Sequence, residues 1–181
     1  MNMILKLLHV VVITLLLLGC GGNDETTDSS RLENTLVKDN KMIEVLNQKP
    51  VMYAKVESFD YIEDASSEFF NITTVVISAD NMNCIAEAKL CEEMVAFIAA
   101  NKLVFSSSEE YALIEEESLE YRMKQKGIVE FNNNTYSATL YYSGESNNNV
   151  APWFTGRLVF ELPEVKLLKG DLLILGIKGK K

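Results

Sequence analysis

Two runs of alternating apolar and polar residues, separated by three asparagines, constrain the fold of this chain most. The first run carries apolar residues at alternate positions between Tyr121 and Phe131, and the second carries them between Tyr136 and Tyr142. A period of two places one face of a strand on a core and the other in water. Because the asparagines 132–134 are turn residues, the pattern predicts a β-hairpin with one wet face.

Strand character continues through much of the remaining chain. It appears in four further segments, namely residues 52–56, 69–77, 153–162 and 172–177. The third of these ends at Pro163, and the fourth is apolar on both faces, as a central strand is. We expect a polar loop from Gly144 to Pro152. Many short strands with limited helix predict a mainly β fold, organised as a β-sandwich.

Two segments have helical spacing instead. Residues 87–101 combine acidic residues in an early turn with Asn101 near the end, so we expect one short, well-formed helix there. Residues 31–48 have apolar residues three and four positions apart, which permits an N-terminal amphipathic helix. The pair Asp39-Asn40 interrupts that pattern and weakens it.

Cys84 and Cys91 lie seven positions apart, and in an exported protein such a pair most often forms a disulfide. Seven residues of continuous helix separate two α-carbons by about 10.5 Å, whereas a disulfide requires less than about 7 Å. We therefore expect Asn83-Cys84 in a loop that folds back against a helix carrying Cys91. A redox-active pair would favour the closer Cys-x-x-Cys spacing.

The first twenty residues read as an export signal. Lys6 gives a charged start, and an apolar stretch follows up to Leu18, too short for a transmembrane helix of about 20 apolar residues. The stretch ends in Leu17-Leu18-Gly19-Cys20, which resembles the lipobox of bacterial lipoproteins. The resemblance implies cleavage after Gly19 and acylation of Cys20 by chains such as palmitate, so that residues 1–19 are removed.

The residues after Cys20 suggest where the protein is attached and how it is organised. Gly21, rather than an aspartate, follows the cysteine, and by the same resemblance this favours the outer membrane, facing the periplasm. A Gram-positive surface lipoprotein would carry the same motif, so the envelope type stays open. Residues 20–30 are small and acidic and are expected to form a flexible tether. Residues 31–181 then form a single globular β-rich domain.

The charge of the mature chain bears on its partners. Removing residues 1–19 leaves 162 residues with 16 basic and 26 acidic side chains, a net charge of 16 − 26 = −10. Such a chain repels phosphate backbones and anionic headgroups, so we expect no nucleic-acid partner and membrane attachment only through the lipid on Cys20. The basic tail 178–181 is interpreted as a solvated end.

Catalytic and metal-binding residues are hard to nominate. The single histidine, His9, lies in the predicted signal peptide, so the mature chain lacks the usual base of serine and cysteine triads and the commonest zinc ligand. The carboxylate clusters 60–64 and 115–117 lack the spacing of a calcium loop, and we interpret them as solvated surface. We therefore expect no catalytic residue, no metal and no cofactor. We expect that the protein is not an enzyme.

A second resemblance concerns the last strands. Gly156-Arg-Leu-Val-Phe-Glu-Leu-Pro163 precedes a final apolar strand and resembles the closing strands of immunoglobulin-like domains in bacterial lipoproteins of unknown function. The resemblance implies a β-sandwich and no chemistry. Tyr141 and Trp153 fall on the polar faces of their strands and are candidates for an exposed contact patch.

The function hypothesis that follows is an interaction or accessory module, tethered to the membrane and bound to an envelope protein. An alternative is a pilotin-like lipoprotein that assists outer-membrane assembly of a secretion component. A third class, a carbohydrate-directed enzyme that uses carboxylates, remains without a pair of residues to carry it.

Overall fold

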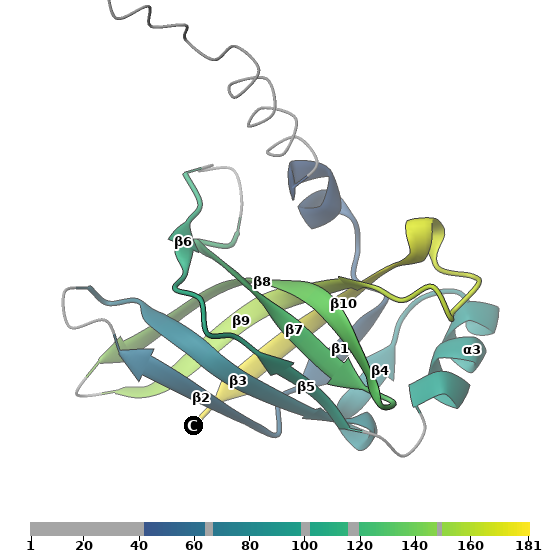
Figure 1. The fold of residues 1–181 in the computed structure, drawn as a ribbon, viewed down its shortest axis with the longest axis horizontal. Helices are drawn as coiled ribbons and strands as arrows, with labels where there is room; N and C mark the ends of the chain where they lie inside the picture. The colour runs from purple at the N-terminus through teal and green to yellow at the C-terminus, as the bar shows by residue number, and fades with distance from the viewer. Residues whose placement is uncertain (1–41, 64–66, 99–101, 116–119, 148–149) are drawn as a thin grey trace, which may run out of the picture. The chain divides into compact units, whose positions relative to one another are not determined.

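The computed structural model describes residues 42–63, 67–98, 102–115, 120–147 and 150–181 (Figure 1). Ile43–Lys181 forms one compact unit. Residues 42–47 form a short helical segment, and α3 (Ala88–Ile98) is the longer helix. The strands are β1 (Met52–Lys55), β2 (Ser58–Glu63), β3 (Phe70–Ser78), β4 (Met82–Cys84), β5 (Lys102–Ser106), β6 (Ala112–Leu113), β7 (Met123–Phe131), β8 (Asn134–Asn147), β9 (Val150–Glu161) and β10 (Leu172–Lys180). The 3-10 turns η1 (Ala79–Asn81) and η2 (Lys169–Asp171) precede β4 and β10.

All strands of the described residues belong to one sheet. Its order is β2-β3-β5-β7-β8-β9-β10-β1-β4, with β6 paired to β7 off this path. Neighbours are antiparallel except β1 and β10, which run parallel. The prediction of a mainly β fold with one short helix is confirmed.

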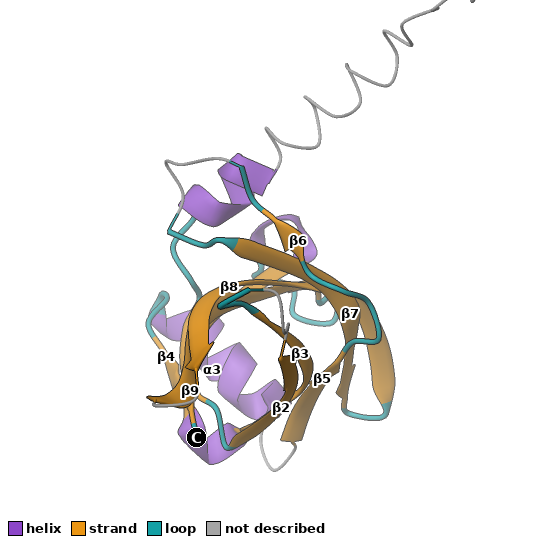
Figure 2. Cartoon of the chain, turned by 90° about the vertical axis from the view of Figure 1, so that its left-hand side faces the viewer, coloured by secondary structure: helices purple, strands orange, loops and turns teal. Residues whose placement is uncertain are grey.

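The sheet curls into a half-barrel because β1 and β2 are consecutive yet lie near opposite ends of the strand order. Only residues 56 and 57 separate these two strands. Val56 N donates a hydrogen bond to Lys178 O of β10 at 3.0 Å, and Glu57 N donates to Val76 O of β3 at 2.9 Å. The two ends of the sheet therefore meet at this point, as the end-on view in Figure 2 illustrates. Opposite walls of the curled sheet then pack together as the sheets of a sandwich do.

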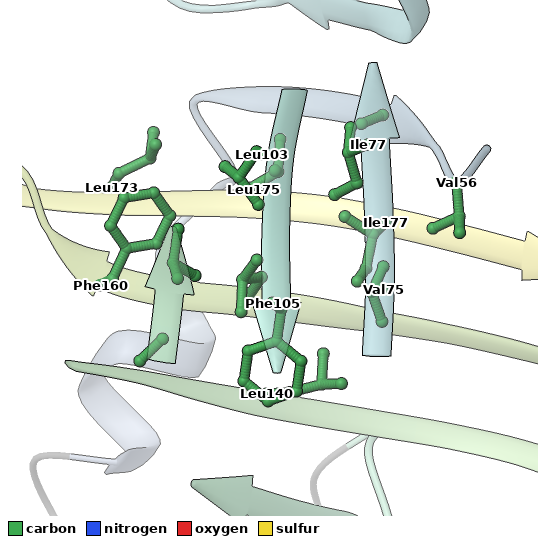
Figure 3. Packing of buried hydrophobic residues seen from close by; sticks show 14 of the residues in the cluster. Val56, Val75, Ile77, Leu103, Phe105, Leu140, Phe160, Leu173, Leu175 and Ile177 are labelled. Atoms are coloured by element: carbon green, nitrogen blue, oxygen red, sulfur yellow. The ribbon is translucent and has the colours of Figure 1, made fainter. Parts of the chain in front are cut away.

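The core fills the inside of the curl. Side chains of β3 and β5 meet those of β8, β9 and β10 there, as Figure 3 shows. Phe59 of β2 contacts Phe154 of β9 edge to face, with ring centroids 5.0 Å apart, although the two strands are not paired. Each fully buried apolar side chain contributes about 1.5–3 kcal/mol, so these contacts hold the curl closed.

The predicted hairpin is confirmed. β7 and β8 pair from Met123–Tyr142 down to Phe131–Asn134. Asn132 and Asn133 form the turn with φ values of 50° and 61°, and positive φ at both central residues defines a type I′ turn. Asparagine tolerates this left-handed conformation better than most residues, which explains why the asparagines mark the turn.

The helix predicted at 87–101 is observed at Ala88–Ile98. Met94 and Ile98 are its fully buried residues, and Asn132 of the hairpin turn donates a side-chain hydrogen bond to Phe97 O at 2.9 Å. The Glu93 carboxylate accepts the backbone N–H of Lys166 at 2.8 Å. The helix thus packs against the turn end of the β7–β8 hairpin, beside the chain that follows β9 (Figure 1).

The polar loop predicted between Gly144 and Pro152 is wrong. β8 runs on to Asn147 and β9 begins at Val150, with Gly144 paired to Phe154. Polar residues are compatible with strand here because the outward side of the ladder is wet. The short strands β2, β4, β5 and β6 were not predicted. Of the predicted N-terminal helix, residues 31–41 lie outside the described residues.

Candidate functional site: the outer face of the sheet

The predicted disulfide partners are brought together. Cys84 and Cys91 have α-carbons 5.6 Å apart and sulfur atoms 2.08 Å apart, which is a disulfide distance. Cys91 lies in the first turns of α3 as expected, whereas Cys84 ends strand β4 rather than lying in a loop. The pair ties the last strand of the sheet order to the helix, which is a structural role. Cys20 lies outside the described residues.

One buried polar side chain of the described residues sits inside the curl, and it also has a structural role. Gln125 is 1 % exposed; its side-chain oxygen accepts Ile72 N–H at 3.1 Å, and its amide nitrogen donates to Glu109 O at 2.6 Å. β3 pairs with β5 only from Thr74 onward, so Ile72 has no ladder partner on that side. The Gln125 amide replaces the missing backbone bonds.

Tyr142 completes this buried network. Its hydroxyl donates to Phe70 O at 2.7 Å and lies 3.2 Å from the Gln125 side-chain oxygen. Burial raises the pKa of Tyr142 far above its ordinary value of about 10, so the ring stays neutral. Gln125 and Tyr142 therefore hold the splayed strands together and are not exposed to a ligand.

The outer face of the sheet carries the chain that leads from the N-terminus. Arg157 of β9 donates to Gln48 O at 2.7 Å and also to Leu46 O. Carbonyls at the end of a helix lack partners within it, and a cation there is favourable. Residues 46–48 are therefore fixed over β9 by the Arg157 guanidinium.

Tyr121 supports the same arginine. Its hydroxyl accepts a hydrogen bond from Arg157 Nε at 3.1 Å, and the guanidinium carbon lies 5.5 Å from the ring centroid. Burial raises the pKa of Tyr121, although the Arg157 charge acts in the opposite direction. Sequence reasoning missed this arrangement because Arg157 was read only as one polar residue of a strand.

The two aromatic residues predicted to form one exposed patch are not brought together. Tyr141 pairs with Arg157 in the ladder and is only 9 % exposed, and burial raises its pKa. Trp153 is half-buried and lies four residues before Arg157 on the same strand, about 13 Å away at 3.4 Å per residue. Tyr141 lies in the covered part of the outer face, and Trp153 lies beyond it.

Basic side chains gather where the outer face is uncovered. Ladder pairs place Ser143 beside Thr155, Thr155 beside Lys178, and Lys178 beside Lys55. Arg122 extends this cross-strand row at its other end, since its backbone N–H bonds Ser143 Oγ at 3.0 Å. Lys180 and Trp153 pair in the next row. We call Lys55, Arg122, Trp153, Lys178 and Lys180 the basic band.

The basic band lacks local neutralisation within the part of the chain that is described. There, the observed ion pairs are Lys102–Glu57 at 2.8 Å and Lys181–Asp60 at 3.7 Å, and neither involves the band. Its four cations are exposed. Glu145, paired with Trp153, is the acidic neighbour in the ladder. From the sequence alone, only the basic tail 178–181 is visible as a cluster. Lys55 is far from it in the chain and becomes its neighbour only through the parallel β1–β10 pairing.

A hollow of about 660 Å³ lies elsewhere on the outer face, over β5, β7 and β8. Half of its lining residues are serines or threonines, and it carries one charge of each sign; the lining comprises residues 106–109, 126–128 and 137–139. Ser107 Oγ donates to Lys126 O at 2.6 Å and fixes one wall. Ile128 is 41 % exposed at its floor, a large apolar side chain within a polar rim. We call this feature the hydroxyl hollow.

Within the described ranges, no group of three or more His, Cys, Asp or Glu side chains is arranged to hold a metal ion. Across those same residues, no helix combines the length and the apolar character needed to cross a bilayer.

Comparison of the chain with protein-family models, with curated proteins and with solved structures gives no match in any of the three. The functional argument therefore rests on the residues and geometry of the outer face.

Proposed function

We propose that this chain is a lipid-anchored lipoprotein of the cell envelope whose body is a non-catalytic module that binds a partner protein. Cys20 carries the lipid, and the module faces the periplasm from the outer membrane. The sequence supports the anchor through the apolar stretch that ends in Leu17-Leu18-Gly19-Cys20. It supports the absence of catalysis through a mature part that contains no histidine.

The hydroxyl hollow is the observation that carries the binding role. The inside of the curled sheet is filled by apolar side chains, whereas the hollow opens outward and combines hydroxyl groups with the exposed Ile128. A polar rim around an apolar centre is the arrangement of a protein-binding surface. The fitting partner is an extended protein segment that covers Ile128 with an apolar side chain and bonds the surrounding hydroxyls through its backbone.

Site-specific photocrosslinking tests the binding role. A photoreactive amino acid at Ser137, within the hollow, should yield a defined adduct in intact envelopes, whereas one at Lys89 on α3 should not. The added substitution Ile128→Asp should abolish the Ser137 adduct without unfolding the body, because Ile128 is on the outer face. An adduct that is unchanged by Ile128→Asp, or that forms equally from Lys89, contradicts the proposal.

Metabolic labelling tests the anchor separately. Radiolabelled palmitate should enter the protein, and Cys20→Ser should abolish the label because the acylated sulfur is removed. Fractionation should find the labelled protein with outer-membrane markers. A label that persists in the Cys20→Ser protein, or no label in the unaltered one, overturns the anchor without bearing on the crosslink.

A further inference from the structure

We infer that the basic band is the surface that lies against anionic lipid headgroups of the membrane to which Cys20 is attached, and that it orients the body there. The inference deepens the proposed function and rests on its lipid anchor. The expectation that charge plays no part in membrane contact is thereby revised.

The first argument is the arrangement of the cations. Neighbouring strands lie about 4.8 Å apart, so Lys55 and Lys178 present two ammonium groups side by side. Like charges at adjacent ladder positions oppose folding. Arg122 extends the row, and Ser143 and Thr155 between them carry hydroxyl groups rather than carboxylates. A row of cations and hydroxyls presents hydrogen-bond donors to phosphate oxygens.

The charges of the body act on the bilayer only over a short distance. The mature chain has a net charge of −10, which by itself repels an anionic surface. Salt screens charges beyond about 8 Å at physiological ionic strength, so only the groups nearest the bilayer contribute appreciably. With the basic band facing the lipid, the near charges are mainly positive. This concentration of cations favours the orientation in which the band faces the lipid.

The third argument is the aromatic content of the same surface. Trp153 is half-buried beside Lys180, and Tyr53, which is 50 % exposed, lies two residues before Lys55 on the same side of β1. The Tyr53 ring contacts Gly176, where an added Cβ would come within 2.6 Å of the ring. Tryptophan and tyrosine are enriched at membrane–water interfaces because one end is apolar and the other polar. A surface of lysines flanked by these rings therefore matches a lipid headgroup layer better than it matches a soluble polyanion, which offers no apolar region for the rings.

The fourth argument is the path of the chain. Residues 46–48 are fixed to the outer face by Arg157, and Arg157 is two residues along β9 from Thr155 of the band row. From Cys20 to Ile43 is 43 − 20 = 23 residues, which span at most about 80 Å. Residues 46–48, at the N-terminal end of the body, therefore lie on the face that carries the band.

The expected strength is modest, as an orienting contact requires. A basic residue near an anionic membrane surface changes affinity about fivefold, so three lysines together change it on the order of a hundredfold. That is too weak to retain a protein on its own. Attachment comes from the lipid, and the band determines which face meets the bilayer.

The experiment uses Trp153, the single tryptophan of the chain, as its own reporter. The lipidated protein is reconstituted into phosphatidylcholine vesicles with and without phosphatidylglycerol. We expect a blue shift of Trp153 emission, and quenching by brominated lipid, only where phosphatidylglycerol is present. The double variant Lys178→Glu/Lys180→Glu should lose both signals, whereas Lys89→Glu/Lys166→Glu, with the same change in net charge at exposed sites away from the band, should keep them.

Three outcomes overturn the inference. The first is Trp153 emission that is the same with and without phosphatidylglycerol. The second is an equal loss of both signals in the two double variants. Reversal of the blue shift by soluble polyphosphate or an acidic peptide, at an ionic strength that leaves vesicle contact intact, would assign the band to that ligand instead. Mass spectrometry of Cys20 in the same sample separates these results from a failure of the proposed anchor. If Cys20 is unmodified, Trp153 emission of the unlipidated chain, titrated with phosphatidylglycerol vesicles to a concentration that populates a weak contact, tests the band alone.

Discussion

The two faces of strand β9 differ although their residues alternate along one short segment of chain. Phe154, Leu158 and Phe160 point into the curl and are fully or almost fully buried. Trp153 and Arg157 point outward, one beside a lysine and the other bonded to the chain at 46–48. The inner face holds the fold together, whereas the outer face carries charge, a docked segment and a hollow.

Residues that stabilise the fold and residues that form the surface sites therefore lie on opposite faces of the sheet in this protein. An inner residue contributes through burial against strands on the opposite wall, so its loss is felt throughout the unit. An outer residue contacts neighbours in its own row, so its loss changes the surface and leaves the core intact. Substitutions that exchange one face for the other at adjacent positions can break this separation.

The largest effect is expected at Phe154. Its ring centroid lies 5.0 Å from that of Phe59, and Phe154→Ala should lower the free energy of unfolding by about 3–5 kcal/mol. Trp153→Ala, one residue earlier, should cost less than about 1 kcal/mol because that side chain lies outside the core. Urea denaturation of both variants measures the contrast. Equal losses would show that the outer face is as structural as the inner one.

A smaller effect is expected from the buried amide. Gln125→Ala leaves Ile72 N–H and Glu109 O without their partner and should cost about 2–3 kcal/mol. Lys124→Ala, at the adjacent outward position, should change stability by less than about 0.5 kcal/mol. Thermal and chemical unfolding report both values. A stable Gln125→Ala protein would mean that water replaces the amide.

Alkaline pH tests the inner face without a core deletion. Burial raises the pKa of Tyr142, so the folded state keeps the neutral phenol while the unfolded chain ionises above pH about 10. The stabilising contribution is therefore complete below pH about 10 and is lost as pH rises further, by about 1.4 kcal/mol per pH unit. Tyr142→Phe should flatten this slope in unfolding measurements. Some slope should remain, because burial also raises the pKa values of Tyr121 and Tyr141.

The smallest effect has the opposite sign. Lys178→Glu replaces the like-charged Lys55–Lys178 neighbours with an attractive pair, and should raise the free energy of unfolding by about 0.2–1 kcal/mol. Lys89→Glu on α3 serves as the matched control. A stabilised Lys178→Glu protein that no longer responds to phosphatidylglycerol would show that the basic band is kept at a cost in stability. A destabilised one would contradict the reading of this pair.

Local patterns in the sequence were enough for part of the inner face, although the core strands β2 and β5 were missed. Alternation around the asparagine turn located β7 and β8, and Pro163 correctly marked the end of β9. The Cys84–Cys91 pairing followed from spacing and helix geometry. These features depend on residues close together in the chain, where periodicity and turn chemistry act directly. The prediction of a loop at 144–152 was wrong because polar residues there resemble a turn. In the structure they lie in paired strands, which accept polar residues on the solvent-facing side.

The outer face was largely out of reach of the sequence. Net charge sums over the whole chain and cannot register that Lys55 and Lys178, 123 positions apart, become neighbours. The hydroxyl hollow and the Arg157 contact likewise depend on pairings between distant segments. Tyr141 was predicted to be exposed, yet it is only 9 % exposed, beside the Arg157 that holds the chain at Leu46. Alternation predicts which way a side chain points, but not what lies over it.

The parallel pairing of β1 with β10 also has a consequence for the order of assembly. β1 is the first described strand and β10 the last, so the sheet cannot close until residues 172–180 have been made. In a chain that emerges N-terminus first, β1 can pair with β4 early, but its other edge stays unpaired until β10 has been made. Contacts of such long sequence separation slow folding relative to locally connected proteins. Loss of the final nine-residue strand would leave both β9 and β1 with bare edges, which are sites for aggregation.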